Sequence, residues 1–185
     1  MSESHEVAEE AAKGGRRHSA LLIAILAAGL AFCEQGAQRA QTAMSDAAIA
    51  AADVWAEYQA KSTRANETRD LAQIAALLPT PTPADHDALQ SRFAADLTRF
   101  ESDPKSGKSA LAKHAQALEA ARDAAHLHLE AYDDAASALQ LGIVLTTASV
   151  ITGSLLLVWA GALLGLVGIA LGLLGWLDPA LAALI

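Results

Sequence analysis

The sequence is poor in cysteine, aromatic residues and positive charge. Cys33 is the single cysteine of 185 residues, so the chain forms no internal disulfide. The net charge is -8, which argues against a basic face for nucleic acid. Only 4% of the residues are aromatic, and alanine and leucine are abundant instead. This composition predicts an all-α fold in one modest unit.

Charge is absent from two long stretches, and this absence predicts transmembrane helices. About 43 residues between Asp134 and Asp178 carry no charge, which is about 64 Å of helix and enough to cross a layer of about 30 Å twice. The apolar run from Ser19 to Cys33 is shorter, about 22 Å, and spans only if flanking charged side chains reach the water. The expected spans are residues 16–35 and two helices within 135–177, with a turn near 152–154.

Small residues recur at intervals of three and four in each apolar segment, so each set lies along one helix face. A glycine inside a helix costs about 1 kcal/mol relative to alanine, and close packing of helices in lipid can offset that cost. The alternative is that glycine is simply common in membrane helices. The predicted packing residues form an alanine row (Ala20, Ala24, Ala27 and Ala31), a mixed row (Gly142, Thr146, Ser149 and Gly153) and a glycine row, or glycine zipper (Gly161, Gly165, Gly168, Gly172 and Gly175).

The first apolar run is open to two other interpretations. Its basic start and short core fit a cleaved signal peptide, with Gly29 and Ala31 as the small residues of a cleavage site. It also ends at Cys33, as a lipoprotein signal does, but Phe32 stands where such signals need a small residue. The alanine row favours a retained transmembrane helix.

Residues 36–134 predict an extramembrane helical domain. Alanine with interspersed charge favours one long helix, which ends at the proline-rich segment after Leu78. Thr82 is a suitable N-cap for the next helix, with Pro83 in the first helical position. We expect these helices to pack antiparallel, as in a coiled coil. The expected elements are a long helix to residue 78, a short helix over 83–102 and a helix from about residue 105 that continues into the membrane.

Basic residues next to the first span predict the topology. Lys13, Arg16 and Arg17 place the amino terminus in the cytoplasm, so residues 36–134 become extracytoplasmic. The two ends of the chain are expected to lie outside the packed structure, with residues 1–15 as a disordered acidic tail and 178–185 as an interfacial tail.

Trp55, Tyr58, Gln59 and Lys61 belong to the stretch Asp53-Val54-Trp55-Ala56-Glu57-Tyr58-Gln59-Ala60-Lys61. This stretch, the first apolar span and the sequence of residues 139–145 resemble the bacterial membrane family called domain of unknown function 4337. The resemblance covers the chain from about Arg16 to Trp176. It implies a helical protein embedded in the bacterial inner membrane, and it brings no active-site residues.

Two polar groups could carry chemistry. The segment from Lys105 to Ser109 ends like a phosphate-binding loop, but Ser102 replaces the glycine that such a loop needs, and a helix precedes it instead of a strand. His126, Glu130 and Asp133 share one helix face that could bind a metal. No further histidine or cysteine cluster supports them, so we expect an interhelix loop and a solvated polar face.

Trp55 and Tyr58 lie about 30 Å of helix beyond the first span, too far to be membrane-edge anchors. We expect them to form a core or subunit contact. The alternative is a site for a small apolar or cationic ligand.

The sequence predicts no enzyme, no cofactor and no metal, because no nucleophile, base and orienting group converge. No Asp, Glu, Lys, Arg or His lies within the apolar runs 19–33 and 135–177, which disfavours ion-coupled transport. We expect a structural or interaction protein that forms a homo-oligomer in the lipid bilayer, since three small-residue rows exceed what one chain easily pairs internally. The alternatives are a pore or transport accessory, in which several copies of the last helix surround a passage, and a sensor subunit that signals through an unidentified protein partner.

Overall fold

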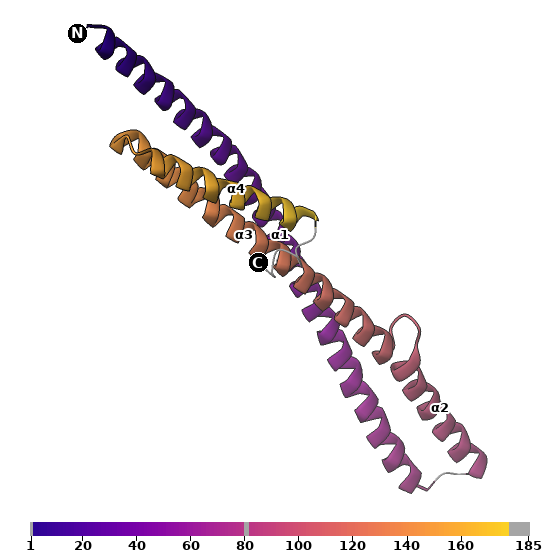
Figure 1. The fold of residues 1–185 in the computed structure, drawn as a ribbon. Helices are drawn as coiled ribbons and strands as arrows, with labels where there is room; N and C mark the ends of the chain where they lie inside the picture. Colours follow the sequence, from indigo (N-terminus) through magenta and orange to yellow (C-terminus); the bar gives the residue numbers. More distant parts are fainter. Residues whose placement is uncertain (1, 80–81, 178–185) are drawn as a thin grey trace. The chain divides into compact units, whose positions relative to one another are not determined.

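The protein is described here by a computed structural model covering residues 2–79 and 82–177, with side chains from Arg17 onward (Figure 1). Over these ranges the fold is entirely helical, which confirms the predicted all-α class. The expected tail at 178–185 lies outside them. The helices are α1 (Ser2–Leu77), α2 (Pro83–Ser102), α3 (Lys108–Thr152) and α4 (Leu155–Leu177).

α1 runs without interruption through three segments that the sequence predicts as different. It begins at Ser2, although we expected a disordered tail to residue 15, and it passes the expected span boundary at Gly36. The physical reason is that no proline occurs before Pro79 and that alanine and leucine favour helix. A glycine costs about 1 kcal/mol, which is too little to end a long helix.

α2 begins as the sequence predicts. Thr82 is the N-cap, and its Oγ1 accepts a hydrogen bond from the backbone nitrogen of Asp85 at 3.2 Å. α3 then begins at Lys108, about three residues later than expected. The delay arises because Asp103 holds a turn, in which the backbone nitrogen of Gly107 donates to the Asp103 carbonyl at 2.8 Å.

The turn between α3 and α4 lies where the sequence predicts it. Gly153 has a φ of 68°, a left-handed conformation that glycine adopts without strain. Its backbone nitrogen donates to the Ser149 carbonyl at 2.8 Å, which ends α3. α4 therefore folds back beside α3 (Figure 1).

The chain forms two compact units. The first contains residues up to 43 and from 124 onward, and the second contains residues 44–123. In the first unit, α4, the later part of α3 and the early part of α1 pack around Leu26, Cys33, Tyr132 and Leu139. In the second unit, the later part of α1 runs in the opposite direction to α2 and to the start of α3 (Figure 1).

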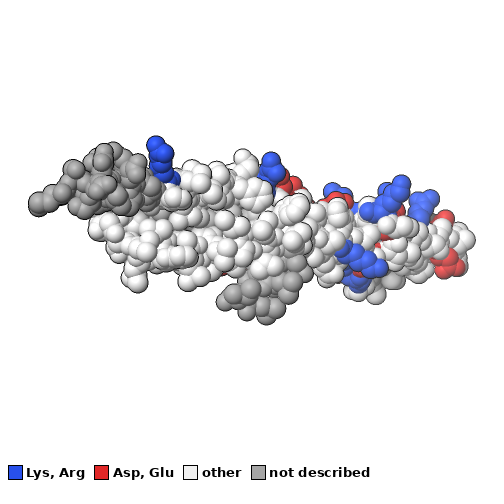
Figure 2. Space-filling model, turned by 45° about the horizontal axis from the view of Figure 1, so that its top comes forward, with Lys and Arg blue, Asp and Glu red and all other residues white. Residues whose placement is uncertain are grey.

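Among the residues that the structure describes, three helices are long and apolar enough to cross a membrane. They are α3, α4 and the part of α1 that begins at Arg17. On the face shown in Figure 2, few charged side chains lie over the first unit, and many lie over the second. These features indicate a membrane protein.

Candidate functional site

The glycine row of α4 is buried along its whole length. All five glycines are buried, and they contact two different helices. Gly161, Gly168 and Gly175 lie against α3, whereas Gly165 and Gly172 lie against Leu26 and Cys33 of α1. The glycines against α3 repeat every seven residues, and so do those against α1. One face of α4 therefore contacts two neighbouring helices.

The glycines lie so close to their neighbours that an added methyl group would require a neighbouring atom to move. A methyl group added at Gly168 would lie 2.7 Å from Leu139 Cγ and 2.9 Å from the carbonyl oxygen of Ala135. One added at Gly175 would lie 3.0 Å from Ala131 Cβ. The bare backbone of α4 therefore permits this packing.

Two members of the mixed row of α3, Gly142 and Thr146, lie against Gly161 of α4. Gly142, Thr146 and Ser149 are buried. The Thr146 hydroxyl donates to the Gly142 carbonyl at 2.8 Å, and the Ser149 hydroxyl donates to the Thr146 carbonyl at 2.6 Å, so their own helix satisfies both. Gly153 differs from our expectation because it lies in the turn, where an added Cβ would meet nothing within 4 Å.

The alanine row lies on the outside of the first unit. Ala20, Ala24, Ala27 and Ala31 are all exposed. The buried face of α1 instead presents Leu26 and Cys33, which are 1% and 2% exposed. At 3.6 residues per turn the centre of this face lies about 130° around α1 from the centre of the alanine row. These two side chains were not predicted as packing residues, although the seven-residue spacing of Ser19, Leu26 and Cys33 indicates a shared helix face.

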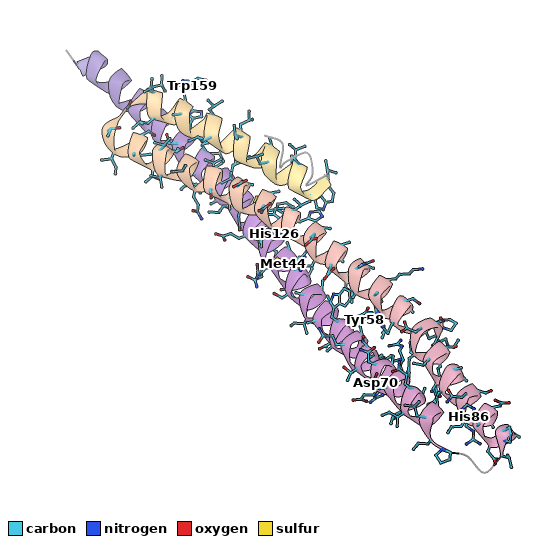
Figure 3. The ribbon with its side chains drawn as sticks, turned by 90° about the horizontal axis from the view of Figure 1, so that it is seen from below. Met44, Tyr58, Asp70, His86, His126 and Trp159 are labelled. Atoms are coloured by element: carbon cyan, nitrogen blue, oxygen red, sulfur yellow. The ribbon has the colours of Figure 1, made fainter. Side chains whose placement is uncertain are left out.

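Of the four residues Trp55, Tyr58, Gln59 and Lys61, three join α1 to the start of α3 or to the loop just before it, in the second unit. The Trp55 indole nitrogen donates to Glu119 Oε1 at 2.9 Å. The Tyr58 ring, labelled in Figure 3, stands edge-on to Trp55 at 5.3 Å, and Lys108 Nζ lies 5.6 Å from its centroid. Lys61 donates to the Ser106 carbonyl.

Gln59 is exposed, so it does not join this group of residues. The other three lie in contacts between helices of one chain. This arrangement favours a core contact over a ligand site.

A comparison with known protein families agrees with the family resemblance seen in the sequence. The sequence profile described as domain of unknown function (DUF4337) matches residues 16–178. The chain belongs to this family. No curated protein and no solved structure gives a significant match. The DUF4337 match includes both compact units, so the second unit, a hairpin of antiparallel helices over residues 44–123, belongs to the family region together with the apolar helices.

In this DUF4337 protein, the segment from Lys105 to Ser109 resembles a phosphate-binding loop. Backbone N–H groups of that segment already donate hydrogen bonds to a carboxylate of the chain itself. Asp103 Oδ1 accepts hydrogen bonds from the backbone nitrogens of Ser106 at 2.7 Å and Lys105 at 2.9 Å. These two bonds, together with one from the Ser106 hydroxyl, lower the pKa of the Asp103 carboxyl below its usual value. The N–H groups that a phosphate would need are therefore committed to Asp103.

The histidines of α3 have two different environments. His126, labelled in Figure 3, lies 3.4 Å from Glu130 in an exposed pair, and no three His, Cys, Asp or Glu residues in the described part of the chain could hold a metal together. His128 Nδ1 lies 2.8 Å from the Gly175 carbonyl. That carbonyl belongs to the last turn of α4, where backbone acceptors lack helical partners. His128 thus caps the DUF4337 α4 helix, a role that its spacing alone did not indicate.

Proposed function

We propose that this DUF4337 protein is an integral protein of the bacterial inner membrane with a structural or interaction role. It assembles as a homo-oligomer through the alanine row and has no catalytic site. Its amino terminus is cytoplasmic, and residues 36–134 form an extracytoplasmic domain of antiparallel, coiled-coil-like helices. The observation that carries the proposal is that the glycine row is buried within the chain while the alanine row is exposed.

The proposal follows from how helices associate in lipid. Large apolar side chains gain nothing by leaving lipid for another helix, whereas small residues let two backbones approach closely. The glycine row is already filled by α1 and α3, so it is not free for a second chain. Four exposed alanines at a spacing of three and four remain on α1. A parallel copy of α1 can meet this face with the same residues, as in a two-fold symmetric dimer.

The packing of α4 also bears on the pore alternative. A passage lined by the glycine faces of several α4 helices would require those faces to leave α1 and α3. The contacts of Gly165 with Leu26 and of Gly168 with Leu139 use the same surface. The geometry therefore favours a packing role for α4.

Substitution in the alanine row tests the proposed assembly. Ala27→Leu should reduce the oligomer in native mass analysis from mild detergent, because the larger side chain separates two α1 backbones. Ala170→Leu is the matched control, since Ala170 is an exposed alanine on α4. A wild-type protein that is strictly monomeric, or an oligomer unchanged by Ala27→Leu, would contradict the proposal.

Cysteine labelling tests the proposed topology. In a Cys33→Ala background, Ala60→Cys should react with a membrane-impermeant reagent in whole cells, and His5→Cys only after permeabilisation. The opposite pattern would overturn the orientation. The size of the mature chain on a blot shows whether the first span is retained.

A further inference from the structure

The three apolar helices of the first unit leave their apolar zone at about the same level. Glu34 is the first charged residue after the apolar run of α1, and Asp134 is the last before that of α3. Gly172, near the end of α4, lies against Cys33. In a membrane this level is the boundary between hydrocarbon and headgroups.

A hollow of about 450 Å³ lies at this level between α1, α3 and the end of α4. Arg39 is the one lining residue with a permanent charge, and it makes no hydrogen bond or ion pair with the residues that the structure describes. The nearby carboxylates of Glu34 and Asp133 line a separate hollow. The hollow therefore presents an uncompensated positive charge, which attracts an anion.

The same hollow has an apolar side. Phe32 and Trp176 line it, and tryptophan is typical of the headgroup level of a membrane. A narrow apolar slot of about 100 Å³ adjoins it, and Phe32 lines both. Gly29, Leu139 and Ile169 also line the slot, so it lies deeper in the apolar zone. A ligand that fills both spaces has an anionic head and a hydrocarbon tail.

We propose that the first unit binds an anionic phospholipid, with its phosphate at Arg39 and part of one acyl chain beside Phe32 in the slot. Basic pockets between transmembrane helices bind anionic headgroups on the cytoplasmic side of membranes. The attraction between a guanidinium and a phosphate is the same on the extracytoplasmic side proposed for Arg39. The inference rests on the proposed insertion into a membrane. It does not depend on oligomerisation, because every lining residue belongs to one chain.

Native mass spectrometry of the full-length, delipidated protein in detergent tests the site. Phosphatidylglycerol should bind more tightly than phosphatidylcholine. Arg39→Gln should weaken phosphatidylglycerol binding about fivefold, the effect of one interfacial basic side chain. Arg64→Gln is the matched control, since Arg64 is exposed in the second unit and should leave binding unchanged. Equal binding of both lipids, or no effect of Arg39→Gln, would overturn the proposal.

Two further measurements test the acyl-chain slot. Glycerol phosphate, which has no acyl chain, should not bind detectably, and binding equal to that of the lipid would show a free-phosphate site instead. Gly29→Ala narrows the slot while its added methyl group lies 3.6 Å from Leu139, an ordinary contact that the fold accepts. This variant should bind phosphatidylglycerol more weakly than the wild type. Unchanged binding would show that no acyl chain occupies the slot.

Flotation with liposomes separates this inference from the proposed function. A chain that fails to float with vesicles would overturn both. A chain that floats and forms oligomers but shows no lipid preference would overturn the lipid site alone.

Discussion

Replacing Gly168 and Gly172 with alanine, one at a time, tests how α4 packs. The two glycines lie one turn apart on the same buried face, so both variants gain the same helix propensity, about 1 kcal/mol. They differ in what the new methyl group meets. At Gly168 it meets the Leu139 side chain and the backbone of α3, while at Gly172 the single close atom is Cys33 Sγ at 2.8 Å.

The expected free energies follow from these neighbours. The α3 backbone beside Gly168 cannot rotate away, so the helices must separate, and overpacking of this kind costs about 1–3 kcal/mol. Cys33 Sγ is the end of a side chain, and moving it away from its preferred rotamer costs about 0.5–1.5 kcal/mol. After the gain in helix propensity, Gly172→Ala should be close to neutral. Gly168→Ala should be less stable than Gly172→Ala by about 1–2 kcal/mol.

Reversible unfolding by SDS in mixed micelles, followed by tryptophan fluorescence, measures this difference. The double variant Gly168→Ala/Leu139→Ala provides a control. It should not regain stability, because the Ala135 carbonyl oxygen remains 2.9 Å from the added methyl group. Equal stabilities of Gly168→Ala and Gly172→Ala would refute the contact assignment, as would recovery in the double variant.

Three further predictions concern the hairpin and the turns. Trp55→Phe removes the hydrogen bond to Glu119 and should lower the free energy of unfolding by about 1 kcal/mol, measured by circular dichroism, whereas Glu57→Gln at an exposed position should change it little. Gly153→Ala should cost about 1–2 kcal/mol through its left-handed backbone alone, and Gly153→Asn should cost less; equal costs would contradict this reason. Because the pKa of Asp103 is lowered by folding, its stabilisation is complete above about pH 4 and is lost as the pH falls through the folded-state pKa. The stability difference between wild type and Asp103→Asn should therefore shrink on acidification, and a difference that grew would contradict the assignment.

The helix boundaries were predictable wherever local chemistry decides them. Pro79 ends α1 and Thr82 caps α2 because these effects act within one turn of the chain. The start of α1 was not predictable in the same way. A charged, glycine-containing segment continues the helix here because nothing in it is strong enough to end one.

Packing partners were harder to predict than packing faces. The spacing of small residues shows which positions share a side of a helix, but it is the same whether that side meets another helix or lipid. The alanine row and the glycine row have equal spacing, and yet one is exposed and the other buried. His128 could not be placed for the same reason, since its acceptor, Gly175, is 47 residues away.

The contacts of α4 explain why glycine occupies its row while alanine occupies the row of α1. Gly161, Gly168 and Gly175 face α3, and Gly165 and Gly172 face α1, so a single narrow face must admit two neighbours. Alternate positions along that face receive the α3 backbone and the side chains of Leu26 and Cys33, and a Cβ at Gly165 or Gly168 would obstruct one of them. A row that meets one identical helix, as we propose for the alanine row, does not need this extra space, and alanine then keeps its higher helix propensity. The choice between glycine and alanine at equal spacing is thus a physical reason to assign the glycine row to folding of the chain, and it supports the proposal that the alanine row associates with a second chain.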